Sequence, residues 1–334
     1  MANKSLQTEI FDYIRKRLPA NTSLPEDLSD VLGISTDSVY RRLRAETLLS
    51  VDELSLLCRH YDISFDMFLG KSRNVLFRYD KLGDSVGFEH YLSTILEDMK
   101  GIRRSENKQI IYAAIDVPIF HHFNYPELSA FKMFYWMKAV VDVDALADKK
   151  FSAEHVNSRF AQLGKEIYET YTRIPSVEIW TEDTINSLIK QIEYYWDSGN
   201  FAETEDALIV CRQAREEVET LKRQAEKSNK LMLENGPEES AFTLYYSDIE
   251  IGNNCIYTRR ADNDLVYLSV HTFNKIITAN PAFNAETQMW LNNLMKKSTL
   301  ISGVSEKSRY RFFKTIESKI DRLYKKIEGA EGPA

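Results

Sequence analysis

The sequence has 334 residues, of which 43% are hydrophobic and 28% charged, and these values are ordinary for a globular protein of about two domains. Its net charge of −7 excludes a polybasic protein that coats nucleic acid or membranes with its whole surface. Three widely spaced cysteines, with no CxxC pair, argue against a zinc ribbon or a disulfide scaffold and favour reduced thiols in the cytoplasm. We find no targeting segment and no apolar run of membrane-spanning length, so we expect no membrane partner.

Charge and composition divide the chain into regions with different roles. The net charge is −1 over residues 1–73 and +4 over residues 285–334, which leaves −10 for the middle of the chain. We expect three regions: a helix-turn-helix domain, a mainly helical sensor or oligomerisation region, and a small α+β region. Their expected bounds are residues 1–70, 74–234 and 241–328, and the sequence leaves open whether the last two form one domain or two.

The first region reads as a bundle of five short helices. Pro19 ends the first helix, Pro25 opens the second, and Ser50 with Glu53 forms a capping box for the fourth. Because the connections are short, only a compact bundle can form. The predicted helices span about residues 6–18, 25–32, 35–45 and 50–61, and a short fifth begins near residue 64.

The remainder reads as a mostly helical α+β region with a few short strands, so the predicted fold class is mainly α. Alternating or continuous apolar runs predict strands, bounded by turn residues. The predicted strands are 74–79, 108–116 and three more within 241–272. Helical periodicity predicts the helices 88–103, Pro126–Leu146, Ala153–Arg173, Asp183–Ser198, Glu203–Leu233, Ala285–Thr299 and Ser305–Ile327.

The sharpest motif is a helix, the sequence Leu32-Gly33-Ile34-Ser35, and a second helix. Gly33 stands where the turn between the two helices requires a positive φ, and Ser35 caps the second helix. Val39 and Leu43 would face the bundle and leave a polar face outside.

That exposed face predicts contact with double-stranded DNA, because arginine can bind guanine edges or phosphates in two hydrogen bonds. Residues near the start of such a helix usually reach base edges, and later ones reach the backbone. The candidates for base contacts are Thr36, Asp37, Ser38 and Arg41. The candidates for phosphate contacts are Tyr40, Arg42 and Arg44.

Residues 25–69 resemble the helix-turn-helix domain of the lambda-repressor-like superfamily. The matching residues are Leu32-Gly33-Ile34-Ser35, Val39, Ser50–Leu54, Leu57 and Ile63–Asp66. The run VYRRLRAE, together with residues 111–138 and 295–313, is similar to regulators of Bacteroidetes-type bacteria with a long uncharacterised C-terminal region. The resemblance implies a DNA-binding transcriptional regulator. Ala45 and Thr36 depart from the family, which often has Gly and Gln there.

An alternative to DNA reading is a protein-interaction adaptor that uses the same helices. Residues Ala207, Cys211, Ala214, Val218, Leu221, Ala225 and Ser228 form a weak heptad seam. We favour an intramolecular helix pair for this seam over a dimeric coiled coil. A homodimer is expected on other grounds, because one reader of this kind contacts only half of a site.

The remaining candidate sites are weaker. Asp116, His121 and His122 follow a buried strand and could hold a metal or act as acid and base, although we favour a structural corner. The aromatic residues between Phe120 and Met137 could line a pocket for a small-molecule effector, or simply form core. The basic segment 296–309 could hold an anionic small ligand, contact DNA phosphate, or serve as a capped helix connection. No catalytic residues, metal-ligand set or cofactor motif emerge, so we expect no enzyme activity and no cofactor.

Overall fold

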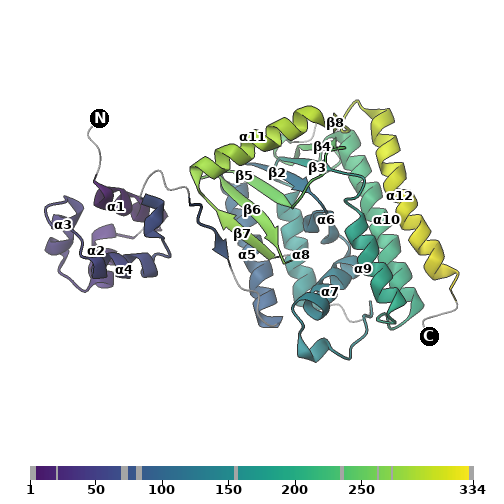
Figure 1. The fold of residues 1–334 in the computed structure, drawn as a ribbon, viewed down its shortest axis with the longest axis horizontal. Helices are drawn as coiled ribbons and strands as arrows, with labels where there is room; N and C mark the ends of the chain where they lie inside the picture. Colours follow the sequence, from purple (N-terminus) through teal and green to yellow (C-terminus); the bar gives the residue numbers. More distant parts are fainter. Residues whose placement is uncertain are drawn as a thin grey trace. The chain divides into compact units, whose positions relative to one another are not determined.

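The computed structural model describes residues 5–19, 22–68, 74–79, 85–153, 157–233, 237–261, 263–271 and 274–330. Contacts group the chain into two compact units, Met1–Leu76 and Phe77–Ala334, which we describe separately (Figure 1). The expected first domain, residues 1–70, falls within the first unit, and residues 69–73 lie outside the described part. Within the described part, no helix is long and apolar enough to cross a membrane.

The N-terminal unit is a small bundle of helices around one apolar core. Ile14, Leu28, Val39 and Leu57 are fully buried, and each comes from a different helix. The expected fifth helix is a 3-10 turn, η1 (Phe65–Phe68), which has no buried residues of its own. The α-helices described in this unit are α1 (Leu6–Arg17), α2 (Leu24–Leu32), α3 (Thr36–Leu43) and α4 (Val51–His60).

In the residues that the structure describes, the second unit is built on one mixed sheet of eight strands. Their order is β1-β7-β6-β5-β2-β3-β4-β8, in which β2, β3 and β4 are parallel and the other neighbours are antiparallel. The strands are β1 (Arg78–Tyr79), β2 (Gln109–Ala114), β3 (Ser176–Trp180), β4 (Phe242–Tyr246), β5 (Cys255–Arg259), β6 (Leu265–Val270), β7 (Asn274–Thr278) and β8 (Thr299–Leu300).

Helices cover both faces of this sheet (Figure 1). Alternate residues of β2 divide between the faces: Ile110, Tyr112 and Ala114 join the large core, while Ile111 and Ala113 pack toward α11 (Pro281–Lys297). The helices of the large core are α5 (Ser85–Arg104), α6 (Ile119–His122), α7 (Pro126–Tyr135), α8 (Ser158–Tyr171), α9 (Asn186–Asp197), α10 (Thr204–Lys227) and α12 (Glu306–Glu328).

The predicted class, mainly helical with an α+β second part, is confirmed, but the sheet is larger than the few short strands expected. β3, β7 and β8 were not predicted, and the expected strand 74–79 is reduced to Arg78–Tyr79. Strands from 74–234 and from 241–328 pair in the same sheet. Contacts therefore place both expected regions in one compact unit.

Two predicted helices end earlier than their periodicity suggests. The helix expected over Pro126–Leu146 passes from α7 into a π-helical turn, Trp136–Val140, and stops before Asp142, whose φ is +58°. The helix expected over Glu203–Leu233 stops at Ser228, whose φ is +50°. Lys230 then turns into the core and donates from Nζ to Ser176 Oγ at 3.0 Å, so tertiary contacts override local preference.

Ala45, which follows α3, offers a test of backbone strain in the N-terminal unit. Its φ is +58°, where an L-residue costs about 1–2 kcal/mol relative to glycine, partly offset by the greater chain entropy of unfolded glycine. We expect Ala45→Gly to raise the free energy of unfolding of this unit by about 0.5–1 kcal/mol. Denaturant unfolding followed by the methyl NMR signals of Val39 and Leu57 measures it.

The matched control is Leu48→Gly, at an exposed position that does not have a positive φ. This substitution should not stabilise the unit. Equal effects of the two substitutions would contradict the assignment of strain to Ala45.

Candidate functional site

The turn between α2 and α3 is held by local hydrogen bonds that fix how the second helix begins. Gly33 has a φ of +63°, and its N–H bonds to the carbonyl of Ser29. The Ser29 hydroxyl donates to the carbonyl of Ile34 at 2.6 Å. Ser35 then caps α3 by accepting from the backbone N–H of Ser38 at 3.3 Å. The predicted roles of Gly33 and Ser35 are confirmed.

α3 has one buried side chain and a broad exposed face. Val39 is fully buried, which anchors the helix in the core. Ser38 is half-buried, and its hydroxyl lies 3.0 Å from that of Ser35, so it contributes to the helix start. The remaining candidates, apart from Arg42, are exposed on the same helix or at its end: Thr36, Asp37, Tyr40, Arg41 and Arg44.

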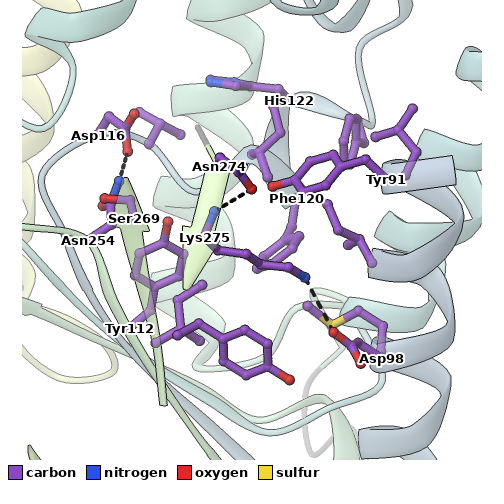
Figure 2. A pocket seen from close by; sticks show the side chains of 18 of the residues that line it. Tyr91, Asp98, Tyr112, Asp116, Phe120, His122, Asn254, Ser269, Asn274 and Lys275 are labelled. Carbon is purple, nitrogen blue, oxygen red and sulfur yellow. Dashed lines mark hydrogen bonds and ion pairs between the residues drawn. The ribbon is translucent and has the colours of Figure 1, made fainter. Parts of the chain in front are cut away.

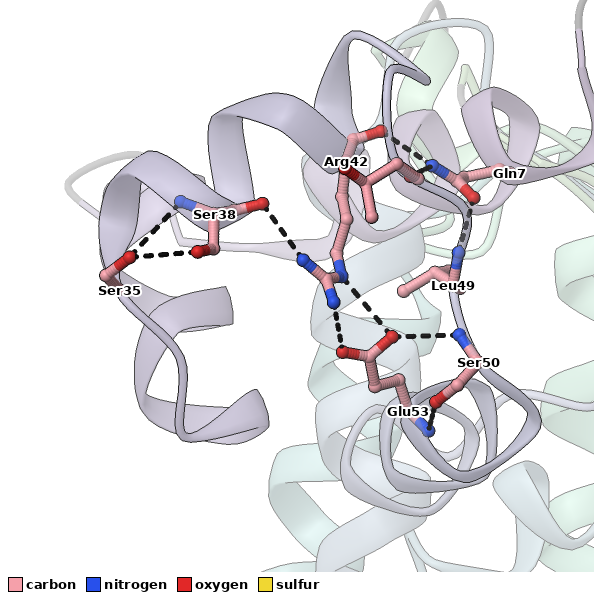
Figure 3. A network of polar contacts seen from close by, with 8 residues as sticks. Gln7, Ser35, Ser38, Arg42, Leu49, Ser50 and Glu53 are labelled. Carbon is pink, nitrogen blue, oxygen red and sulfur yellow. Dashed lines mark hydrogen bonds and ion pairs between the residues drawn. The ribbon is translucent and has the colours of Figure 1, made fainter.

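Arg42 has a role inside the bundle that its sequence position did not predict (Figure 3). Its guanidinium makes two hydrogen bonds to the Glu53 carboxylate, at 2.6 and 3.3 Å, and a third to the Ser38 carbonyl at 3.2 Å. Both side chains of the pair are only 15% exposed. Arg42 joins α3 to the start of α4, and we therefore remove it from the set of phosphate candidates.

Gln7 supports the loop that follows α3, a role that the sequence did not indicate. It is buried on α1, and its Nε2 donates to the carbonyls of Arg42 at 2.7 Å and Thr47 at 2.9 Å. Its Oε1 accepts from the N–H of Leu49 at 2.8 Å (Figure 3). One amide therefore fixes the loop that follows α3. A lone glutamine in a helical pattern carries no sequence signal for this role.

The two exposed arginines each have an acidic neighbour. Arg41 lies 3.2 Å from Asp37, one turn earlier on α3. Arg44 makes two hydrogen bonds to Glu46, at 2.7 and 3.1 Å, and these bonds lower the pKa of the Glu46 carboxyl. Because these pairs are exposed to solvent, each is weak and can exchange for another anion.

The weaker candidates do not converge on a metal or an acid–base site. His121 Nε2 lies 2.8 Å from Glu178, His122 Nδ1 lies 2.7 Å from Glu217, and Asp116 accepts from Asn254 at 2.6 Å. Each group thus has its own partner in a different direction. No group of three metal-ligating side chains occurs among the residues that the structure describes.

The structure also shows the surroundings of the three remaining sequence candidates. The seam of α10 from Ala207 to Ala225 is buried within the chain, and α10 packs on α12. In the basic segment 296–309, the buried Arg309 donates hydrogen bonds to the carbonyls of Ile301 and Gly303. These bonds favour the interpretation of the segment as a connection between α11 and α12. The aromatic run divides: Phe131 is core, whereas Phe120 and Trp136 line a cavity.

Comparisons with known proteins give no match to this chain, whether with family models, with curated protein sequences or with solved structures.

The Arg42–Glu53 pair provides a stability prediction for the unit that carries α3. Arg42→Met leaves the mostly buried Glu53 without its partner, and we expect a loss of about 1–3 kcal/mol in the free energy of unfolding. The exposed pair of Arg44 is the control, and Arg44→Met should leave the free energy of unfolding nearly unchanged. A loss as large for Arg44→Met would contradict the assignment.

The same pair predicts a dependence on pH. Burial raises the pKa of Glu53, but hydrogen bonds from the Ser50 backbone and from Arg42 outweigh it and hold the pKa below the ordinary value of 4.5. The stabilisation is therefore present above pH 4.5 and is lost as the pH falls through the folded value. Unfolding of the wild type and Glu53→Gln between pH 3 and 7 should show a difference that shrinks toward acid.

Proposed function

We propose that this protein is a sequence-specific transcriptional regulator that inserts α3 into the major groove of double-stranded DNA. The observation that carries the proposal is the combination of a tight α2–α3 turn and an exposed α3 face with two accessible guanidinium groups. The side chains of Arg41 and Arg44 are 59% and 55% exposed. Thr36 and Asp37 are exposed in the first turn of α3, and we expect them to reach base edges.

The electrostatics of this surface favour modest, salt-sensitive affinity. Of the three arginines in VYRRLRAE, Arg42 is used inside the bundle, and the other two have acidic neighbours. Phosphates would compete with Asp37 and Glu46 for the same guanidinium groups. Each neutralised phosphate contributes about −0.9 to the slope of log K against log salt, so few contacts give a shallow slope.

Two copies are needed for a full operator if each unit reads one half-site. The α10 seam is already buried within the chain, so a homodimer would use a different surface. The second unit would then set the spacing of the two readers and respond to a small-molecule or protein effector. A palindromic selected site would support this arrangement, because operator symmetry mirrors protein symmetry.

Selection from a random duplex pool with the full chain tests the proposal. We expect an enriched site, and we expect Arg44→Ala to weaken binding to it and to reduce the salt slope by about 1. Arg41→Ala should weaken binding and relax preference at one base position, by about 1–3 kcal/mol. Arg212→Ala removes an equally charged, ion-paired arginine from α10 and is the control. No enriched site, or equal effects of all three variants, would refute the proposal.

Substitution of Glu46 is expected to strengthen DNA binding rather than weaken it. Glu46→Gln removes the negative charge that holds Arg44 but keeps the size of the side chain. We expect tighter binding to duplex DNA, by roughly threefold to tenfold at low salt, with the gain disappearing as salt rises. Filter binding or fluorescence anisotropy across salt concentrations measures it. Weaker binding by this variant would show that Glu46 itself contacts the DNA.

The adaptor alternative rests on one specific observation about the same unit. Leu48 and Val51, which precede and open α4, are 75% and 83% exposed, and apolar side chains this close together can mark a protein contact. If Leu48→Ser and Val51→Ser abolished a regulatory effect in cells while DNA affinity stayed unchanged, protein contact would be the function of this surface.

A further inference from the structure

The second unit contains a cavity between α5, the end of β2, and strands β6 and β7 (Figure 2). Its volume is about 110 Å³, which is of the order of the roughly 150 Å³ apolar cavity that accepts a molecule the size of benzene. Most of the wall is apolar, with aromatic side chains on several sides, among them Tyr91, Tyr112, Phe120, Trp136 and Tyr267. Such walls suit a flat or ring-sized apolar body.

Most charged groups in the lining already have partners. Lys275 lies 3.3 Å from Asp98 and above the rings of Tyr91 and Tyr267. Asp116 accepts a hydrogen bond from Asn254, as Figure 2 shows. These groups form the polar part of the wall, and because they already have partners they do not require a ligand of either charge.

Lys132 differs from the other charged groups, because it is 3% exposed and makes no ion pair with a carboxylate among the described residues. Its Nζ donates to the neutral Oε1 of Gln191 at 2.5 Å and lies 5.2 Å from the centre of the Trp136 ring. Burial lowers the pKa of Lys132 to about 8, against the opposing charges of Asp116 and Glu217. A buried ammonium with a neutral acceptor is stabilised by any anion that reaches it.

We propose that this cavity binds a small organic acid, with its ring-sized or short apolar body between the aromatic walls and its carboxylate paired with Lys132. The carboxylate would receive charge-assisted hydrogen bonds from Nζ in a mostly apolar site, where such bonds are stronger than in water. The inference names an effector class for the proposed regulator and so rests on the proposed function for its role. The binding itself is measured without DNA.

Thermal unfolding and calorimetry of the full chain, with phenylacetate, indole-3-acetate and octanoate as probes, test the proposal. The matched neutral and cationic probes are 2-phenylethanol and 2-phenylethylamine. We expect saturable binding and a raised Tm for at least one acid, with at least tenfold weaker binding of the alcohol and the amine. No saturable binding of any acid, or equal binding of the amine, would overturn the proposal.

Variants separate the role of Lys132 from a general effect of charge. Lys132→Met should weaken binding of the acid at least tenfold, whereas Lys165→Met, at a lysine 76% exposed on α8, should leave it unchanged. Lys132 lies in the core, so a second variant keeps the test informative if Lys132→Met folds poorly. Ile119→Trp enlarges a half-buried wall residue and should block the acid by filling the cavity.

Retention of binding by a folded Lys132→Met or Ile119→Trp variant would overturn the proposal. The DNA selection separates this result from the proposed function. If the chain binds DNA but no acid, the proposed function stands and the effector class is wrong. If it binds an acid but no DNA, the ligand stands and the proposed function is wrong.

Discussion

A buried carboxylate organises the second unit. Glu178, in the centre of β3, is fully buried and accepts hydrogen bonds from Tyr171 and from Trp180 Nε1 at 2.8 Å, and His121 Nε2 lies 2.8 Å away. Burial alone would raise its pKa, but His121, Tyr171 and the charge of Lys230 outweigh that effect and hold the pKa below its ordinary value. α6, α8 and β3 meet at this group, and Lys230, which follows α10, bonds to Ser176 on the same strand, so these elements restrain one another. Removing any one partner would leave a buried charge only partly compensated.

The same carboxylate explains why β3 could not be predicted from the sequence. A glutamate in the middle of a five-residue run breaks the apolar pattern that identifies a buried strand, and only the partners brought by tertiary folding compensate for it. Lys230 has the same effect on α10: its burial requires the helix to end at Ser228, where the periodicity continues. In both places a polar group with distant partners decides the local structure.

The N-terminal unit was easier to predict because local chemistry determines it. Gly33, Ser35 and the capping box at Ser50 act within a few residues of themselves, and the structure bears out each of them. The partner of Arg42 was missed for a different reason. Periodicity places a side chain on a face of its helix, but it does not show that Glu53, eleven residues later, lies opposite with a carboxylate that is itself part of a helix cap. A helical wheel therefore predicts which side chains are exposed better than it predicts which residues they pair with.

The cavity and the chain that leads from the N-terminal unit share one element. β7 supplies Asn274 and Lys275 to the cavity wall, and β1 pairs with this strand through Arg78 and Tyr79. β1 is the first strand of the second unit, and a two-residue ladder at a sheet edge opens at low free energy cost. If a bound ligand stabilised β7, it would favour the closed β1–β7 ladder over the open one.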